Sequence, residues 1–117
     1  MAGYDVIIVG NGPAGLSAAL YTSRANLKTL VIGKDQGALA KAERIENYFG
    51  MAEPVSGCEL VENTKQQAKS LGAALVTDEI FHISWNQGFV LEGREGTYQA
   101  VSVLLATGSS RKKADIK

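Results

Sequence analysis

The 117-residue sequence is poor in side chains that carry out chemistry unaided, with one cysteine and one histidine. Cys58 cannot close an internal disulfide or form a dithiol couple, which agrees with a reducing compartment, and we interpret it as a structural thiol. His82 alternates with apolar neighbours and has no companion ligands at metal spacing, so we expect a strand residue and no metal site.

The sequence also lacks net charge and long apolar runs. Twelve acidic side chains balance twelve basic ones, so we expect neither nucleic acid nor an anionic membrane as a partner. The first apolar stretch, residues 5–9, is too short to span a bilayer and precedes a glycine turn rather than a signal-peptide cleavage site. We therefore expect one small cytoplasmic domain.

Glycine, by contrast, is placed with a clear pattern. Gly10, Gly12 and Gly15 follow the apolar strand residues 6–9 and open a helical pattern, as in the G-x-G-x-x-G turn that cradles a pyrophosphate. Pro13 suits the first helical position, and the free amides from Ala14 onward would face the phosphates. The alternative is a tight turn with a purely structural role.

The remaining pattern predicts a Rossmann-like α/β fold. Helical spacing over residues 13–26 precedes a strand over 29–32, an irregular stretch over 33–55, a helix over 56–72 with a capping box, and a short strand over 74–77. Residues 80–85, 88–92 and 97–100 indicate an antiparallel meander, and residues 101–106 a buried parallel strand.

Placing the last strand beside the first gives the parallel order 3-2-1-4, whose winding reverses between the first and fourth strands. The turn at Ala106, Thr107 and Gly108 then lies next to the Gly10 turn, at the carboxyl ends of both strands. Such a switch point is where open α/β sheets bind ligands, so we expect the cofactor there.

The second strand ends in Gly33, where many dinucleotide-binding domains carry an acidic residue for the ribose, roughly 20 residues after the glycines. Asp35 could reach the ribose only by a different loop path. The simple NAD fingerprint therefore fails at its discriminating position, and an NAD-dependent dehydrogenase domain is disfavoured.

Motifs spread over nearly the whole chain resemble the FAD domain of low-molecular-weight thioredoxin reductases. They are the glycine turn with its helix, the Ile-Glu-Asn-Tyr-Phe-Gly segment at residues 45–50, the Ser56-Gly57 helix start, and the Ala-Thr-Gly turn at residues 106–108. The family tolerates a glycine at the position of Gly33.

The resemblance implies FAD as cofactor and assigns further contacts. The backbone around Gly33 and Lys34 would approach the ribose, Asn47 would reach towards the flavin, and Val76 would contact the adenine side through its main chain. The family usually carries Gly-Gly-Gln-Leu after the second strand, whereas this chain has a shorter Gly-Ala-Leu at residues 37–39. A ferredoxin-dependent-like subgroup also varies in this loop, so the electron donor can be NADPH, NADH or ferredoxin.

The resemblance also implies what the complete protein contains. Family members add an NAD(P)H-binding domain, or a ferredoxin-linked counterpart, with a Cys-x-x-Cys dithiol, and then a segment that completes the FAD domain. We therefore expect residues 1–110 to be the N-terminal part of an FAD-binding domain and residues 111–117 a linker.

The implied activity is electron transfer through flavin to a dithiol and on to a thioredoxin-like protein disulfide, in a homodimer. This chain alone would be inactive. The alternative of a different class is a non-catalytic nucleotide-binding module.

Overall fold

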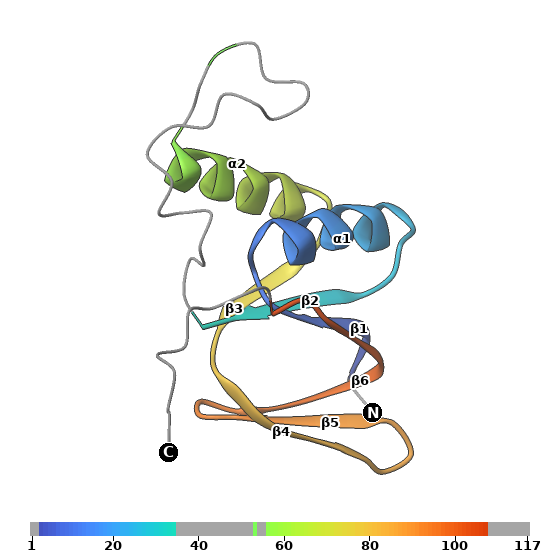
Figure 1. Cartoon of the computed structure of the whole chain (residues 1–117). Coiled ribbons are helices and arrows are strands. Elements are labelled where there is room, and N and C mark those ends of the chain that lie inside the picture. The colour runs from blue at the N-terminus through green and yellow to red at the C-terminus, as the bar shows by residue number, and fades with distance from the viewer. Residues whose placement is uncertain (1–2, 35–52, 54–55, 108–117) are drawn as a thin grey trace, which may run out of the picture.

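The computed structural model of the chain describes residues 3–34, 53 and 56–107. Strands and helices follow one another as Figure 1 shows: β1 (Tyr4–Val9), α1 (Pro13–Arg24), β2 (Thr29–Gly33), α2 (Gly57–Ser70), β3 (Ala74–Thr77), β4 (Ile80–Trp85), β5 (Phe89–Gly93) and β6 (Thr97–Leu105). Most of the predicted irregular stretch over residues 33–55 lies outside the described residues.

The strands form one six-stranded sheet in the order β3-β2-β1-β6-β5-β4. β3, β2, β1 and β6 are parallel to one another. β5 runs antiparallel to both of its neighbours, β6 and β4. The predicted parallel order is therefore confirmed, with the last strand beside the first. Because the connection from β1 runs to β2 on one side and the later chain returns to β6 on the other, the winding reverses between β1 and β6.

Two predictions about the sheet are wrong. Residues 97–100 and 101–106 were expected to be two strands, the second of them buried, yet residues 97–105 form the single strand β6, in which Val101, Leu104 and Leu105 are exposed. Ala100 is paired on both sides, with Tyr4 of β1 and with Phe89 of β5. The change from alternating to continuous apolar residues at this point marks a change of neighbouring strand rather than a turn, so the meander is continuous with the parallel sheet.

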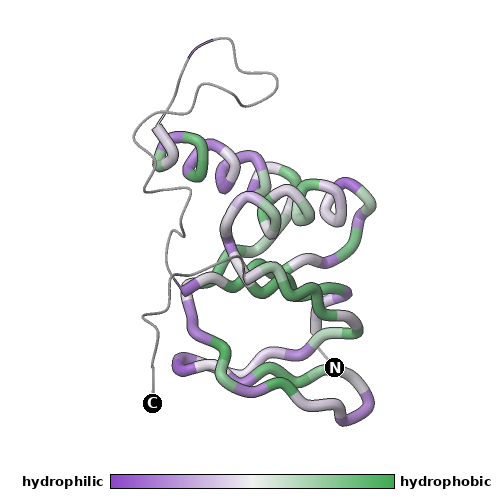
Figure 2. The backbone as a smooth tube through the Cα atoms, in the orientation of Figure 1, coloured by the Kyte–Doolittle hydropathy of each residue, from purple (hydrophilic) through white to green (hydrophobic). Residues whose placement is uncertain are grey.

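The core has two layers, one on each face of the central strands. The helices α1 and α2 cover one face, and β4 and β5 fold across the other (Figure 1). Figure 2 shows the apolar residues gathered along the central strands between these layers. The helix-side cluster consists of Val6, Ile8, Leu16, Ala19, Val31 and Val61. The meander-side cluster consists of Ile7, Leu30, Ile32, Leu91 and Ala100.

This two-sided burial explains the unbroken β-branched run of the first strand. Val6 and Ile8 contribute to one cluster and Ile7 to the other. Burying a side chain of this size contributes about 1.5–3 kcal/mol, so both faces of β1 favour the fold. β1 is consequently a rigid base for the glycine turn that follows it.

Local signals set the helix ends. Asn26 adopts a left-handed φ of 64° just after α1, as its residue type predicts. The Ser56 hydroxyl accepts a hydrogen bond of 3.1 Å from the amide of Glu59, which confirms the predicted cap of α2. Neither helix of the described ranges is long and apolar enough to be a membrane span.

The side chains of His82 and Cys58, to which we assigned no catalytic or metal-binding role, lie on the surface. His82 is exposed on β4, and Cys58 is exposed in the first turn of α2. The rings of Trp85 and Phe89 meet edge to face, with centroids 4.9 Å apart, across the β4–β5 turn.

Candidate dinucleotide-binding site

Three strand ends meet at the carboxyl edge of the parallel sheet. The amide of Gly10 donates to the carbonyl of Ile32 at 2.7 Å, and the amide of Ala106 donates to the carbonyl of Val9 at 2.8 Å. These bonds continue the ladders of β2 and β6 to the last residue of β1. The edge that bears the glycine turn is therefore held by its neighbours on both sides.

Gly10 fixes how closely the two glycine-containing turns approach. Its φ of 124° lies in the region that favours glycine, and a Cβ there would overlap the carbonyl oxygen of Ala106. The structure thus brings the Gly10 turn against Ala106 and Thr107, as the switch-point argument predicts. Gly108, predicted with them, lies outside the described residues.

Gly15 has a different steric role. It is buried in the first turn of α1, where a Cβ would overlap the carbonyl oxygen of Gly10. The absence of a side chain lets α1 begin directly against the turn. Both Gly10 and Gly15 are therefore explained by contacts within the protein.

Gly12 has no such explanation. Its φ is −80°, which any residue adopts, and a Cβ built on it meets no atom of the described residues within 4 Å. The position opens onto free space at the N-terminus of α1. A purely structural turn gives no reason for glycine here, whereas a phosphate approaching the main chain does.

The N-terminus of α1 is prepared for an anion. Pro13 is the first helical residue, no side chain caps the helix, and its first turn contains no acidic residue. The first helical bond runs from the amide of Leu16 to the carbonyl of Gly12 at 3.0 Å. The amides of Ala14 and Gly15 lie before that bond, at the end of the helix where the dipole attracts negative charge. Pro13 and Ala14 are exposed there.

Gly33, the last residue of β2, is buried. A Cβ at this position would overlap the side-chain amide of Asn11, which reaches over from the glycine turn. Asn11 therefore lies where the side chain of an acidic residue at position 33 would begin. The sequence analysis did not single out Asn11, because it occupies a variable position of the glycine motif.

Beyond Gly33 lies a group of charged side chains. Lys34 Nζ is 3.1 Å from one carboxylate oxygen of Glu79, and Arg94 Nε is 3.0 Å from the other. The hydrogen bond from Lys34, and the positive charges of Lys34 and Arg94, lower the pKa of Glu79. Glu79 therefore carries a full negative charge at neutral pH. Sequence reasoning missed both Glu79 and Arg94, because they meet only when β3, β4 and β5 are in place.

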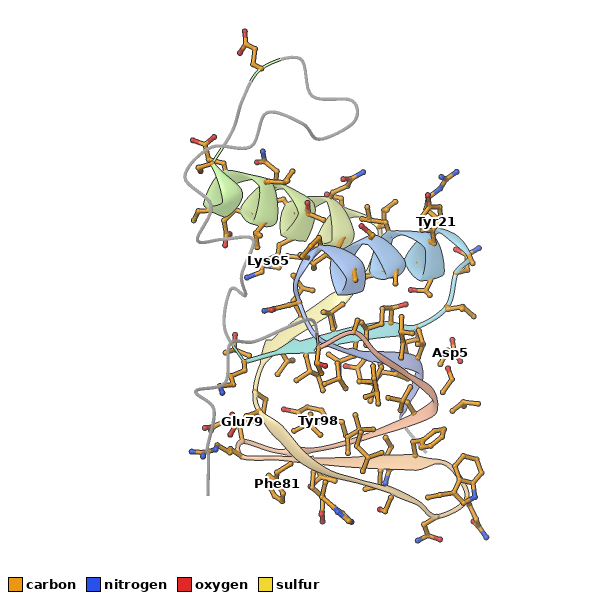
Figure 3. All side chains as sticks on the ribbon, in the orientation of Figure 1. Asp5, Tyr21, Lys65, Glu79, Phe81 and Tyr98 are labelled. Atoms are coloured by element: carbon orange, nitrogen blue, oxygen red, sulfur yellow. The ribbon has the colours of Figure 1, made fainter. Side chains whose placement is uncertain are left out.

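The neighbouring Asp78 holds this region together. Its amide donates to the carbonyl of Gly33 at 2.9 Å. Its buried carboxylate accepts hydrogen bonds from the hydroxyl of Tyr98 at 2.7 Å and from the amides of Glu79 at 2.7 Å and Glu95 at 3.1 Å. Figure 3 shows Tyr98 and Glu79 at the same end of the strands.

The hydrogen bond between Tyr98 and Asp78 contributes to the pKa shifts of both side chains. Burial acts to raise the pKa of Asp78, but the hydrogen bonds from Tyr98 and the backbone amides outweigh it and lower that pKa. Burial and the adjacent carboxylate of Asp78 raise the pKa of Tyr98 to about 12. The end of β2 is thus fastened to the β5–β6 hairpin through a charged, fully bonded aspartate.

Two predicted contacts lie farther from the glycine turn. Val76 pairs with Ile32 in the β2–β3 ladder, one residue before the strand end where Thr77 pairs with Gly33. It is half-buried at that edge, on the side of β2 away from β1. Asn47 lies outside the described residues.

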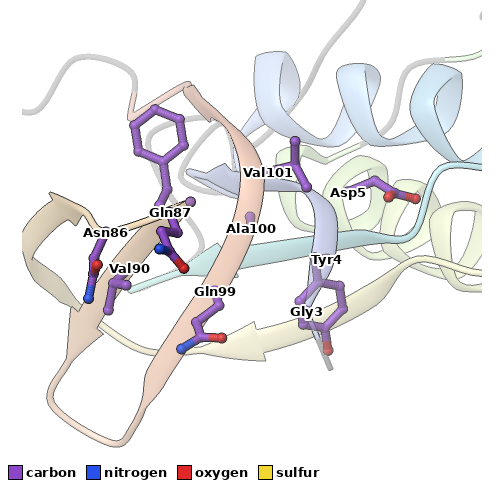
Figure 4. A pocket seen from close by; sticks show the side chains of 11 residues that line it. Gly3, Tyr4, Asp5, Asn86, Gln87, Val90, Gln99, Ala100 and Val101 are labelled. Atoms are coloured by element: carbon purple, nitrogen blue, oxygen red, sulfur yellow. The ribbon is translucent and has the colours of Figure 1, made fainter. Parts of the chain in front are cut away.

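A cavity of about 430 Å³ lies elsewhere, at the amino end of β1 (Figure 4). Residues 3–5, 86–90 and 99–101 line it. None of these residues belongs to the glycine turn at residues 10–15 or to a helix N-terminus, and ligands of open α/β sheets bind at the carboxyl ends of the strands. The candidate site is therefore the edge around Gly12 and not this cavity.

The parallel strands, with the glycine turn and the N-terminus of α1 at their switch point, give the chain the FAD/NAD(P)-binding Rossmann-like fold. Residues 4–117 match the pyridine nucleotide-disulphide oxidoreductase family. The chain belongs to that family.

Thioredoxin reductases are among the proteins most similar to this chain. It is 48% identical over 116 residues to thioredoxin reductase of Treponema pallidum, covering 97% of this chain and 38% of that protein. The relative from Aquifex aeolicus is 39% identical over 120 residues, and 36% of its length is covered. The chain therefore spans less than two fifths of these relatives, and the resemblance to thioredoxin reductases is confirmed.

Solved structures agree in fold. A thioredoxin reductase from Gloeobacter violaceus superposes with a TM-score of 0.91 at 35% identity, over 97% of this chain and 37% of that one. The atypical thioredoxin reductase TRi from Desulfovibrio vulgaris Hildenborough gives 0.88 at 41% identity, over 96% of this chain and 38% of that one. The α/β class, as part of a larger fold, is thus confirmed.

Proposed function

We propose that the carboxyl edge of this sheet binds the diphosphate of FAD and that the chain is the flavin-binding part of a thioredoxin-reductase-like disulfide oxidoreductase. The observation that carries the proposal is Gly12, whose missing side chain serves no contact with any described residue, at the N-terminus of α1, where glycine as the N-cap residue provides no side-chain cap. A dianionic diphosphate satisfies both features at once. Similarity to thioredoxin reductases over 97% of the chain supports the same cofactor.

Each part of the edge has a separate binding task. The amides of Ala14 and Gly15 donate to the diphosphate, and the backbone of Gly33 and Lys34 approaches the adenosine ribose. Val76 offers its main chain to the adenine. Residues 106–108 would line the other wall, and Asn47 would reach towards the flavin. When bound, FAD supplies the electron-transfer chemistry, whereas this chain supplies position and electrostatics.

The dithiol that accepts the electrons must come from elsewhere in the protein, because this chain has one cysteine. In our proposal the remaining part carries the Cys-x-x-Cys dithiol and an NAD(P)H- or ferredoxin-linked domain. The final acceptor is a thioredoxin-like protein disulfide, and the complete enzyme is a cytoplasmic homodimer. Residues 1–110 belong to the FAD domain and 111–117 to a linker.

The outer edge of β6 supports this division. Among the described residues, the ladder partners of residues 101–105 all come from β1, because β5 pairs only as far as Ala100. Val101 and Leu105 are 72% and 65% exposed. Apolar side chains beside an unpaired edge indicate that a further segment of the protein covers this part of the sheet.

Absorbance of the purified protein tests the cofactor. We expect a flavin spectrum, and FAD rather than FMN in the supernatant after heat denaturation. Retention should be weaker in residues 1–117 alone than in the complete protein, because the β6 edge is uncovered. A colourless protein that binds NAD would overturn the proposal in favour of a dehydrogenase domain.

A turnover assay tests the enzymatic role. Residues 1–117 should bind flavin without reducing a protein disulfide, whereas the complete protein should reduce one with a suitable electron donor. Turnover by residues 1–117 alone would contradict the proposed division of labour. A complete protein that holds FAD without any reductase activity would instead support a non-catalytic nucleotide-binding module.

A further inference from the structure

The end of β2 carries an arrangement of charges that the flavin role does not explain. Two cations, Lys34 and Arg94, converge there on the single carboxylate of Glu79, with N–O distances of 3.1 and 3.0 Å. Glu79 bonds Lys34 through one oxygen and Arg94 through the other. Both of its carboxylate oxygens are therefore occupied by the two cations.

The position of these three charged side chains, at the end of β2, relates them to recognition of the ribose. In doubly wound domains the end of the second strand faces the 2′-hydroxyl of the adenosine ribose, and a cation nearby accommodates a 2′-phosphate. Here Gly33 removes the acidic side chain that would reject such a phosphate, and Lys34 follows immediately. Without Glu79, Lys34 and Arg94 would lose the carboxylate that pairs with both of them, next to the place where a 2′-phosphate binds.

We infer that Glu79 is a specificity-determining residue that makes this edge select an unphosphorylated adenosine ribose over a 2′-phosphorylated one. It does so by occupying Lys34 and Arg94 and by repelling the additional phosphate. This inference rests on the proposed function, because it assumes that the adenosine half of the ligand lies at the end of β2. Discrimination through an added repulsive charge is a common route to specificity.

The exposure of the three side chains makes the effect measurable. The side chains of Lys34 and Arg94 are 69% and 74% exposed, and that of Glu79 is 35% exposed. Ion pairs this accessible are weak, so removal of the carboxylate leaves the fold intact and frees both cations to turn towards a new anion. One added charge contact in water changes affinity by about fivefold.

Displacement of FAD from the protein, followed by flavin fluorescence, gives the affinities of two probes. Adenosine 5′-monophosphate and adenosine 2′,5′-bisphosphate differ only in the 2′-phosphate. For Glu79→Gln we expect an affinity gain of about fivefold for the bisphosphate and little change for the monophosphate. The gain should shrink as salt rises, since the Debye length falls from about 10 Å at 0.1 M to 3 Å at 1 M.

Glu62→Gln is the matched control, because the half-exposed Glu62 pairs with Lys65 within α2 at an N–O distance of 3.8 Å, on a different element from Lys34, Glu79 and Arg94. It removes the same charge and should leave the ratio of the two affinities unchanged. Adding Arg94→Gln to Glu79→Gln should reduce the gain. The double variant shows whether the freed cation causes it.

The outcomes separate the two proposals. If no flavin binds to the unaltered protein, the proposed function itself fails. If the monophosphate competes normally but Glu79→Gln leaves the affinity ratio unchanged, or Glu62→Gln changes it equally, only the role of Glu79 is overturned.

Discussion

Replacing Gly12 by alanine separates the binding role of the glycine turn from its structural role. The added methyl group would project into the space at the N-terminus of α1, where residues 3–34, 53 and 56–107 offer no atom within 4 Å. The fold should therefore accept the change, while a diphosphate seated on the same backbone should not. Few single substitutions in this chain distinguish the two roles so cleanly.

Two opposing effects determine how Gly12→Ala changes the free energy of unfolding. Alanine stabilises by about 0.4–1 kcal/mol where it can adopt the native backbone, because it restricts the unfolded chain. The φ of −80° and ψ of −167° at Gly12 are accessible to alanine. As the N-cap of α1, however, glycine is better than alanine by up to about 1 kcal/mol. The free energy of unfolding should consequently change by less than about 1 kcal/mol.

The effect on the cofactor should be much larger. A methyl group at Gly12 would hold the diphosphate away from the amides of Ala14 and Gly15. A hydrogen bond to a charged group contributes about 1.5–3 kcal/mol, so losing one weakens FAD binding by at least about tenfold. Flavin fluorescence titration measures the affinity, and urea unfolding of the flavin-free protein measures the stability.

Gly96→Ala is a suitable control. A Cβ at Gly96 would make ordinary contact with Tyr98 at 3.5 Å, in the hairpin away from α1. It should leave FAD affinity unchanged. If Gly12→Ala bound FAD as tightly as the unaltered protein, or if it unfolded the protein, the argument from open space at Gly12 would be refuted.

Three further predictions concern stability. Gly10→Ala should lower the free energy of unfolding by at least about 2 kcal/mol in urea, because it combines backbone strain with overlap between the new methyl group and the carbonyl oxygen of Ala106. A cost near zero would contradict that. Ser56→Ala should cost about 1 kcal/mol through loss of the α2 cap, and Ser56→Asp should restore it. The lowered pKa of Asp78 implies a contribution to stability that is present above its unfolded pKa and is lost as pH falls below about 4. The pKa of Tyr98, raised to about 12, implies a second contribution that is present below about pH 10 and is lost as pH rises above it. Thermal melts across pH should show both limbs, and Tyr98→Phe should flatten the alkaline one.

The parallel part of the fold was predictable because its signals are local. A buried β-branched strand, a glycine turn with proline at the first helical position, and a left-handed Asn26 each depend on neighbours within a few residues. The parallel order then followed from placing the last strand beside the first, so that the two glycine-containing turns meet at a switch point. The same kind of signal gave the cap at Ser56.

The long-range features were not predictable in this way. Whether residues 97–105 form one strand or two depends on which strand pairs with each half, and the sequence alone does not show that. Glu79 and Arg94 are separated by a full hairpin, so neither suggested an ion pair. The contact between Asn11 and Gly33 likewise joins a turn to a strand end through space.

The unpaired half of β6 has a consequence for handling the protein. Its amides and carbonyls on the side away from β1 have no ladder partner among the described residues, and, flanked by Val101 and Leu105, they can template strand addition from another molecule as readily as from the same one. Molecules prepared as residues 1–117 should self-associate with rising concentration, and a lysine substituted for Val101 should oppose that self-association. In our proposal, the edge that a further segment would cover is therefore also an edge through which separate molecules can associate.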